Sequence, residues 1–434
     1  MKALKLLAAG LLALAVAGSA SAQTFVKVTG STAFRAGTVA AIIDSLTTPT
    51  GAFVGSNING ANQAIIHGFL KSGPSAGAEV YFQLAWAGSV GGMNATTNGL
   101  TQIPGAFTPT TTWLSSANTL STVSVTVSGG GFVYTFAGGT NLGSPVFDAA
   151  SRPDVTMSDT FQNTTNFATP VLANAGNNGI VGIIPFVWVK GPDSAAVDAA
   201  APGGYARFTN IDQNGAKNLL AAGAVPLSVF TGNSADQGVD VIISGRNNDS
   251  GTRFAAFCES QFGPNGAPIQ WVLTNDGTNI NNVGTAYAAA DGYSSGGTLS
   301  KAVNLPPSAG AVATETNGVP FIVVTYVGVA DAMNVNQGQN TLSYNGVAAP
   351  IEVTPGTLDI FASGLAAKIQ QGVYKFWEYE HLYYRNGLAT VQQNAANLVT
   401  TQIGTDALAS GIKNDVSMQV SRANELQPVV SLIR

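Results

Sequence analysis

Residues 246–252 read Arg-Asn-Asn-Asp-Ser-Gly-Thr, and this stretch decides the fold. It follows the apolar run 239–243 and precedes a segment in which Phe254, Phe257 and Phe262 have helical spacing. A strand, a Ser/Gly turn and a helix start place free backbone N–H groups at one point. Hydroxyls there add donors, and the guanidinium of Arg246 adds positive charge. The stretch therefore predicts an α/β unit whose turn binds an oxyanion.

Two further segments have the same chemistry. Gly30-Ser31-Thr32 follows the apolar strand 24–28 and leads into a helix whose apolar face is Val39, Ile42, Ile43 and Leu46. Gly88-Ser89-Val90-Gly91-Gly92 follows a second strand-like run, 80–86. Strands that alternate with loops and helices in this way predict an α/β sheet.

A fourth segment adds an acidic residue. Val155 and Met157 alternate with polar residues as in a strand, and Ser158-Asp159 closes that strand. A buried anion must recover from the protein the hydrogen bonds that it made with water. An aspartate beside it is costly unless the anion carries a proton, which phosphate does near neutral pH and sulfate does not. Asp159 therefore predicts a preference for phosphate over sulfate.

Each segment also has a plainer interpretation. The chain has 51 glycines, so a single Gly/Ser turn is more often a turn than a ligand site. Asp159 alone is more often a helix N-cap, and Arg246 alone is usually a surface residue or a salt-bridge partner. The anion-site hypothesis gains its weight from four compatible segments in one exported chain.

The N-terminus predicts export. Lys2 and Lys5 precede an apolar run, 6–17, and Ala20-Ser21-Ala22 is a small-residue cleavage site, so residues 1–22 read as a signal peptide. Cleavage leaves 16 basic residues against 23 acidic ones and moves the net charge from −5 to −7. No later run of about 18 apolar residues follows, so we expect no stable membrane insertion and a periplasmic or secreted product.

Composition narrows the function further. Charged residues make up 9% of the chain, well below the usual ~25%, and no basic block is present, so nucleic acid is an improbable partner. The single cysteine, Cys258, excludes an internal disulfide. The only histidines, His67 and His381, lack partners at ligand spacing, so we expect no metal and no cofactor.

Three other segments carry structural expectations. Val123, Val125 and Val127 precede three glycines and a second alternating run, which predicts a β-hairpin inside an insertion at about 97–147. The runs 180–189 and 321–327 read as buried strands. Residues 365–384 read as a helix, with Ile369, Val373, Phe376 and Trp377 on one face.

Together these blocks resemble the phosphate-binding proteins that serve ABC transporters, within the type 2 periplasmic-binding-protein superfamily. The strongest match is Arg246 followed by Ser250-Gly251-Thr252, and the next are the Ser89 loop and Ser158-Asp159. The chain departs from the family at Ala33, where relatives often have a second threonine. It departs again at Val90, which replaces a serine, and at Asn248, which replaces an acidic residue.

The resemblance implies an α/β, two-lobed fold of type 2, with a mixed sheet flanked by helices in each lobe and the hairpin inserted in lobe one. Lobe one would span 23–178 and 352–434, and lobe two 179–351. The implied function is capture of inorganic phosphate or a similar oxyanion between the lobes, without catalysis, by a monomer that delivers it to an ABC-type permease. The implied ligand-binding residues are Ser31, Thr32, Ser89, Asp159, Arg246, Ser250, Gly251 and Thr252.

Two alternatives stay open. The low charge and the Asn/Ser/Thr-rich composition also suit a cell-surface or matrix protein that uses a binding-protein fold without a transport role. Gly292-Tyr293-Ser294-Ser295-Gly296 matches the nucleophile elbow of α/β-hydrolases, and Asp359 and His381 follow in the required order, which suggests a serine hydrolase.

Overall fold

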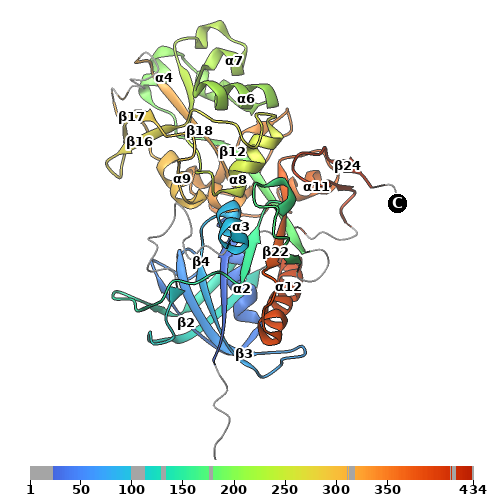
Figure 1. Cartoon of the computed structure of the whole chain (residues 1–434). Helices are drawn as coiled ribbons and strands as arrows, with labels where there is room; N and C mark the ends of the chain where they lie inside the picture. The colour runs from blue at the N-terminus through green and yellow to red at the C-terminus, as the bar shows by residue number, and fades with distance from the viewer. Residues whose placement is uncertain are drawn as a thin grey trace, which may run out of the picture.

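The computed structural model describes residues 23–98, 113–128, 133–174, 179–309, 311, 318–410, 412 and 417–432. Within them the predicted α/β class is confirmed, because a mixed sheet of 14 strands is flanked by helices (Figure 1). The predicted signal peptide, 1–22, lies outside these residues. Among the helices described here, none is both long and apolar enough to cross a bilayer.

The sheet runs through the whole molecule. One end contains β1 (Thr24–Gly30), β4 (Glu79–Ala85), β3 (Gln63–Leu70), β2 (Leu46–Val54), β6 (Ser121–Ser128) and β7 (Val133–Gly138), with β8 (Thr140–Asn141) beside β2. The other end contains β12 (Ile180–Lys190), β18 (Phe321–Gly328), β15 (Asp240–Ile243) and β14 (Ala224–Pro226). Between the two ends lie β10 (Val155–Ser158) and β22 (Trp377–Tyr384), with β11 (Ala173–Asn174) beside β22.

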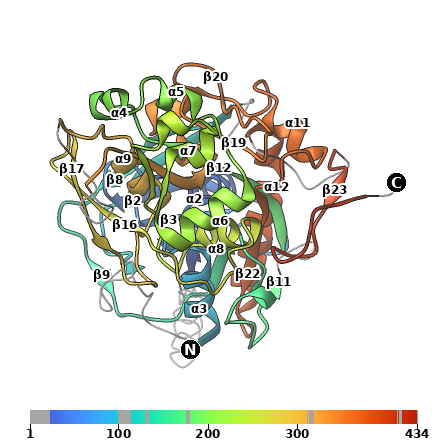
Figure 2. The same cartoon turned by 90° about the horizontal axis from the view of Figure 1, so that it is seen from above.

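Helices cover both ends of the sheet. Those near the first end are α2 (Arg35–Asp44), α3 (Ser89–Asn98) and α12 (Thr390–Ser410). Those near the second are α4 (Ala195–Ala200), α5 (Gly204–Arg207), α6 (Gln213–Ala222), α7 (Leu227–Thr231), α8 (Gly251–Glu259), α9 (Gly296–Val303) and α10 (Val329–Ala332). Seen from above, α6, α7, α8 and α9 surround β12, while α11 (Leu365–Gln370) lies at the rim (Figure 2).

Short strand pairs complete the fold. They are β5 (Trp113–Leu114) with β9 (Phe147–Asp148), β13 (Asn210–Ile211) with β19 (Ser343–Tyr344), β16 (Trp271–Asn275) with β17 (Ile280–Ala286), β20 (Glu352–Thr354) with β21 (Thr357–Leu358), and β23 (Val420–Ser421) with β24 (Val430–Ser431). In the part of the chain that the structure describes, short 3-10 helices lie at Gln162–Thr164, Ser234–Asp236 and Asn336–Gly338.

The long strand β12 joins the two ends of the sheet. Its first half, Ile180–Pro185, pairs antiparallel with β22, and its second half, Phe186–Lys190, pairs antiparallel with β18. The predicted boundary between lobes, at residue 179, falls directly before this strand. The sheet therefore continues across that boundary, and the division into 23–178, 179–351 and 352–434 stays a prediction.

The predicted helix over residues 365–384 is wrong. Only α11 is helical there, and 377–384 form strand β22, of which every residue except Tyr384 is buried. A strand that is covered on both faces shows no alternation of apolar and polar residues. Its aromatic residues therefore matched helical spacing by chance. Leu46, expected at the end of the first helix, begins strand β2 instead.

The hairpin in the predicted insertion is confirmed. Strands β6 and β7 pair antiparallel with Val125 opposite Phe136, while the predicted glycine turn, 129–131, lies outside the described residues. Strand β6 also pairs with β2, so the hairpin extends the main sheet. The strands predicted at 24–28, 80–86, 180–189 and 321–327 are present as β1, β4, β12 and β18.

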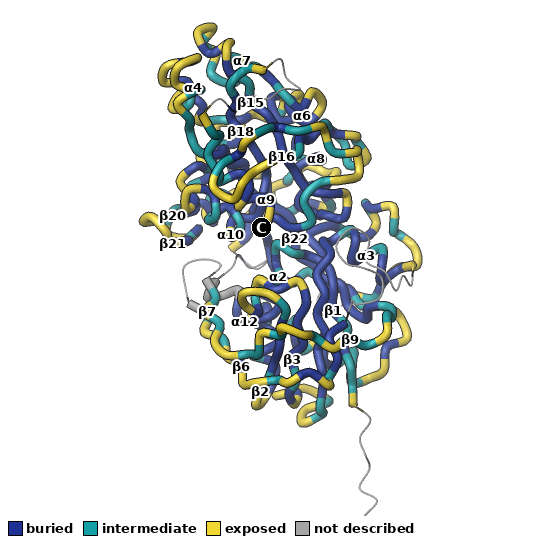
Figure 3. Tube along the Cα trace, turned by 90° about the vertical axis from the view of Figure 1, so that its left-hand side faces the viewer, coloured by how far each residue is buried: buried dark blue, intermediate teal, exposed yellow. Residues whose placement is uncertain are grey.

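The buried residues follow the central strands through the molecule, and exposed residues gather at the loops of both ends (Figure 3). Val39, Ile42 and Ile43 of α2 are buried in this core, as the helical spacing predicted. Burial of such apolar surface, worth roughly 25 cal/mol per Å², fixes α2 against the sheet. It thereby fixes the turn at 30–32 that precedes the helix.

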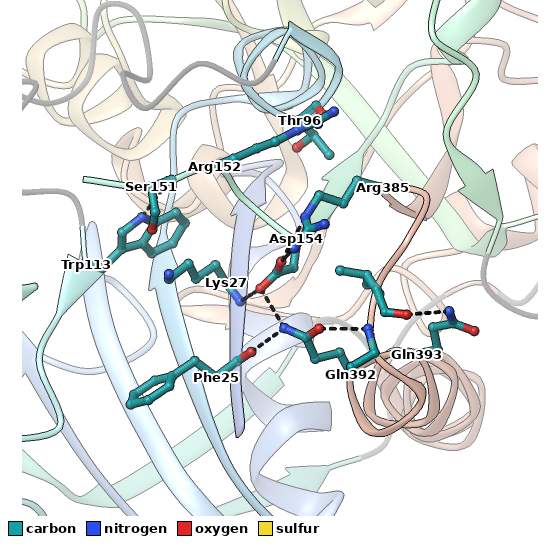
Figure 4. A network of polar contacts seen from close by, with 12 residues as sticks. Phe25, Lys27, Thr96, Trp113, Ser151, Arg152, Asp154, Arg385, Gln392 and Gln393 are labelled. Carbon is teal, nitrogen blue, oxygen red and sulfur yellow. Dashed lines mark hydrogen bonds and ion pairs between the residues drawn. The ribbon is translucent and has the colours of Figure 1, made fainter. Parts of the chain in front are cut away.

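A buried carboxylate ties the strands that lead to this turn (Figure 4). Asp154, before β10, accepts hydrogen bonds from the Lys27 backbone N–H at 2.9 Å and from the Arg385 Nη2 at 2.7 Å. Gln392 of α12 donates to the same carboxylate at 3.3 Å and to the Phe25 carbonyl at 2.7 Å. One side chain thus holds β1, β10, α12 and the loop after β22 in register.

A second arginine holds α3. Arg152 donates from Nε to the Thr96 carbonyl at 2.9 Å and from Nη2 to the Thr97 carbonyl at 3.0 Å (Figure 4). These carbonyls lie near the C-terminal end of α3, where a cation is favourable for a helix. The contact fixes the orientation of the helix that begins at Ser89.

The close approach of β1 and β10 gives a test of the fold. Gly30 has φ +111°, and a Cβ there would lie 1.9 Å from the Met157 carbonyl oxygen. We expect Gly30→Ala to lower the free energy of unfolding by about 2 kcal/mol or more, since it adds both strain and a clash. Gly143→Ala is the control, because no atom lies within 4 Å of its Cβ position. Equal stability of the two variants in urea unfolding would contradict the packing described here.

Candidate functional site

The segment around residue 250 has the predicted strand–turn–helix geometry. Strand β15 ends at Ile243 and α8 begins at Gly251. Ser250 is the N-cap, and its Oγ accepts a hydrogen bond from the Arg253 backbone N–H at 3.2 Å. A capping serine satisfies one of the N–H groups that a helix start leaves free.

Arg246 is buried and reaches across the molecule. Only 1% of the surface of this residue is exposed to solvent. Its Nη2 donates a hydrogen bond to the Thr32 Oγ1 at 3.2 Å. The guanidinium also donates to the carbonyls of Tyr293 and Ser294, at 3.1 and 3.0 Å. The Nη1 nitrogen makes no hydrogen bond to any described residue. The turn after β1 and the loop after β15 therefore meet at this guanidinium.

Asp159 lies where three predicted segments meet. Its backbone N–H donates to the Ser89 Oγ at 3.2 Å, and the Thr252 Oγ1 donates to its Oδ2 at 3.5 Å. Gly251 packs so closely that a Cβ there would lie 1.5 Å from the Asp159 Oδ1 and 2.8 Å from the Ser89 Cβ. Only glycine fits at 251 in this arrangement.

The start of α3 also touches the Arg246 segment directly. The backbone N–H groups of Val90 and Gly91 donate to the Asp249 carbonyl at 3.0 and 3.1 Å. Ser31 completes the group from β1, since its N–H donates to the Met157 carbonyl at 2.9 Å and its Oγ accepts from the Phe34 N–H at 3.2 Å. All eight predicted residues thus lie in one region, and all but Thr32 are buried. We call this region the Arg246–Asp159 site.

Burial controls the charge of Asp159. Removal from water raises the pKa of its carboxyl from 3.8 to about 6, and the Ser89 hydroxyl and the Arg246 charge offset only part of this rise. The Oδ1 oxygen is buried without a hydrogen-bond partner. A buried acceptor without a hydrogen-bond partner is costly. A ligand that donates a hydrogen bond to the Oδ1 oxygen would therefore bind favourably at this point.

Two acidic residues near the site were missed by the sequence analysis. Glu380 of β22 is fully buried, and burial raises its pKa well above the ordinary value, with the Asp159 charge adding to the rise and the nearby Ser31 hydroxyl reducing it. Neither of its carboxylate oxygens has a hydrogen-bond partner of good geometry. Asp331 of α10 is the largest charge partner of Arg246, and burial raises its pKa as well.

The residues of the hydrolase alternative do not form a triad. The backbone carbonyl of Ser294 accepts from Arg246, and Asp359 accepts from the N–H groups of Phe361 and Ala362 in a turn. His381, in strand β22, has its Nδ1 3.2 Å from the Ser158 carbonyl oxygen. No hydrogen bond joins any two of these three described residues. Among the described residues no group of three or more His, Cys, Asp or Glu side chains could hold a metal ion.

No protein-family model and no curated protein matches the chain. Similar solved structures include a protein from Clostridium perfringens, named as a phosphate ABC transporter substrate-binding protein with bound phosphate. It has a TM-score of 0.45 and 11% identity, over 90% of this chain and 100% of that one.

Two further structures are more distant. A protein from Planctomyces limnophilus DSM 3776, named as a phosphate binding protein, has a TM-score of 0.32 and 13% identity over 84% of this chain and 82% of that one. An ABC-type phosphate transport receptor from Vibrio cholerae has a TM-score of 0.31 and 13% identity over 59% and 77%.

The raised pKa of Asp159 predicts a specific effect of pH on stability. The carboxyl holds its proton more tightly in the folded state than in the unfolded state, so its charged form destabilises the fold above pH 6. As pH falls from about 6 toward 4, the folded state takes up the proton first and this cost disappears. We expect ligand-free Asp159→Asn to be more stable than wild type at pH 7.5, by up to about 3 kcal/mol, and this difference to shrink at pH 5.

Urea unfolding at the two pH values measures the effect. Asp198→Asn is the matched control, because it removes an exposed carboxyl and should change stability by less than about 0.5 kcal/mol. A stability difference between Asp159→Asn and wild type that is the same at both pH values would show that Asp159 is not desolvated.

Proposed function

We propose that the protein is an exported, non-catalytic receptor that captures inorganic phosphate at the Arg246–Asp159 site and delivers it to an ABC-type permease. One observation carries the proposal: a buried guanidinium and a buried carboxyl of raised pKa come together from segments far apart in the chain. Around them lie the hydroxyls of Ser31, Thr32 and Ser89 and the first turn of α8. This is the donor set that a dehydrated tetrahedral anion needs.

The combination of one cation and one acid suits a protonated oxyanion. Arg246 supplies charge and donors to the phosphate oxygens. Asp159 supplies the acceptor, because its Oδ1 lacks a partner and can take the proton that phosphate carries near neutral pH. Sulfate has no such proton, and its oxygens would face the lone pairs of the carboxylate. The receptor would therefore select phosphate over sulfate as well as bind it.

The first test removes the cation. We expect Arg246→Ala to weaken phosphate binding by more than about tenfold, since hydrogen bonds to charged groups contribute about 1.5–3 kcal/mol. Isothermal titration measures the affinity. Lys217→Ala is the control, because it removes one positive charge from an exposed position on α6. Equal affinity of Arg246→Ala and wild type would overturn the site assignment.

The second test addresses selectivity. We expect Asp159→Asn to lower the ratio of phosphate to sulfate affinity by about tenfold or more, because the amide nitrogen can donate to either anion. Titrations of both anions at pH 7.5 give this ratio. If the ratio were unchanged, Asp159 would not be the residue that recognises the proton.

The screen that separates transport from the cell-surface or matrix alternative is a titration of the mature protein with phosphate, arsenate, sulfate and molybdate. Binding of phosphate supports the receptor. Absence of heat and of any rise in melting temperature with all four anions would favour the alternative, since a ligand that binds only the folded state must stabilise it.

A further inference from the structure

The C-terminal segment, residues 417–432, contains two buried charged side chains. It forms the strand pair β23–β24 beside α11, where the Gln419 backbone N–H donates to the Gln370 carbonyl at 2.9 Å (Figure 2). Within this segment, Arg422 and Glu425 are each only 4% exposed. Charged side chains are rarely buried to this extent without partners, so their contacts show what the segment holds in place.

Glu425 binds the chain directly after Asp159. Its Oε1 accepts a hydrogen bond from the Phe161 backbone N–H at 2.5 Å, and its Oε2 accepts one from the Thr164 Oγ1 at 2.8 Å. Hydrogen bonds to a carboxylate are about twice as strong as those between neutral groups. Glu425 therefore fixes the position of Phe161, which is two residues after Asp159, against the C-terminal segment.

Side-chain hydrogen bonds hold the carboxyl of Asp159 only weakly. Its Oδ1 has no hydrogen-bond partner, and its Oδ2 accepts from the Thr252 Oγ1 at 3.5 Å, longer than the ordinary O–H···O range of about 2.5–3.0 Å. The backbone before Asp159 is fixed by strand β10, which ends at Ser158. The backbone after it is fixed at Phe161, one residue farther than its neighbour. The contact of Glu425 with Phe161 therefore limits where the carboxyl of Asp159 can lie.

Arg422 anchors the same segment at the centre of the sheet. Its Nη1 donates to the Glu378 Oε1 of β22 at 2.5 Å, and its Nη2 donates to the Lys375 carbonyl at 2.6 Å. The same Nη2 lies 3.7 Å from the Oε2 of Glu259, the last residue of α8. Helix α8 begins in the Arg246–Asp159 site. The C-terminal segment therefore contacts both this helix and the turn that carries Asp159.

This group of charges is a costly way to stabilise a fold. One cation, Arg422, lies among three acidic residues, namely Glu259, Glu378 and Glu425. Burial raises the pKa of Glu425 to about 7, so its ionised form is unfavourable compared with a carboxylate in water. Packed hydrophobic residues often stabilise a protein as well as a buried ion pair does. The cost favours a role in placing neighbouring residues over a role in stability alone.

We propose that Glu425 is a positioning residue for Asp159 and sets the selectivity of the site for phosphate over sulfate by holding the chain at Phe161. Glu425 acts through the backbone of the turn, and Arg422 keeps its segment in place. This inference rests on the proposed function, because selectivity is expressed only if the anion binds beside Asp159. It adds a residue that lies far from the anion-binding turns in the sequence.

The first measurement compares two substitutions at one position. Isothermal titration with phosphate and with sulfate at pH 7.5 gives the ratio of the two affinities. We expect Glu425→Ala to lower this ratio by about tenfold, since a displaced Asp159 no longer makes its hydrogen bond to the phosphate proton. Glu425→Gln keeps an oxygen that can accept from the Phe161 N–H, so its ratio should stay within about threefold of wild type.

A double substitution separates the placement of Asp159 from a general loosening of the fold. Asp159→Asn already lacks the acceptor, so adding Glu425→Ala should change the ratio by less than about twofold. An equal fall in both backgrounds would show that Glu425 does not act through Asp159, and would overturn the inference. Glu352→Ala is the matched control and should keep the ratio. Glu352 also accepts from a backbone N–H, that of Gly356 at 2.9 Å, but in the β20–β21 hairpin.

A milder variant keeps the test decisive if Glu425→Ala does not fold. Thr164→Val leaves Glu425 with the Phe161 N–H as its partner, and we expect it to lower the ratio by about threefold, the effect of one ordinary hydrogen bond. A wild-type ratio in the folded variants at positions 425 and 164 would overturn the inference and leave the proposed function standing. Wild-type protein that binds neither anion would overturn both.

Discussion

A guanidinium that is almost completely removed from water must recover its hydrogen bonds and its counter-charge from the protein. Arg246 does so by using the Thr32 hydroxyl from one end of the sheet and the carbonyls of Tyr293 and Ser294 from the other. The turn after β1, the loop after β15 and the segment before α9 must therefore come together around one side chain. Much of the remaining architecture serves to hold these segments in place.

The carboxyl groups around Arg246 give the site its second property. Asp159 and Asp331 both lower the cost of burying the cation, yet neither is joined to it by a salt bridge. Burial raises the pKa of each, so the site holds acids whose protons are retained more strongly than in water. A site of this kind discriminates by the protonation state of its guest as well as by shape. Burial also raises the pKa of Glu380 in strand β22, which favours its neutral form.

The sequence predicted which turns lie close together better than it predicted the strands around them. Turn chemistry is local, so the Ser/Gly segments at residues 31, 89 and 250 could be recognised from neighbouring residues alone. Strand β22 could not, because a strand that is buried on both faces lacks alternation and its aromatic run resembled a helix. Because 377–384 were assigned to a helix, the sequence analysis overlooked Glu380. An acidic residue within an otherwise aromatic, apolar run was the feature that could have identified it. Asp331 approaches Arg246 only through the tertiary fold, so no local pattern marked it.

The central claim is that the Arg246 guanidinium and the Asp159 carboxyl hold one tetrahedral anion between them. The most direct measurement is a crystal structure of the mature protein grown with inorganic phosphate at pH 7.5. The account predicts tetrahedral density within about 3.2 Å, ordinary hydrogen-bond distance, of both the Arg246 guanidinium and the Asp159 carboxyl. Phosphate density at another place, or a site that stays closed around the two side chains at saturating phosphate, would contradict it.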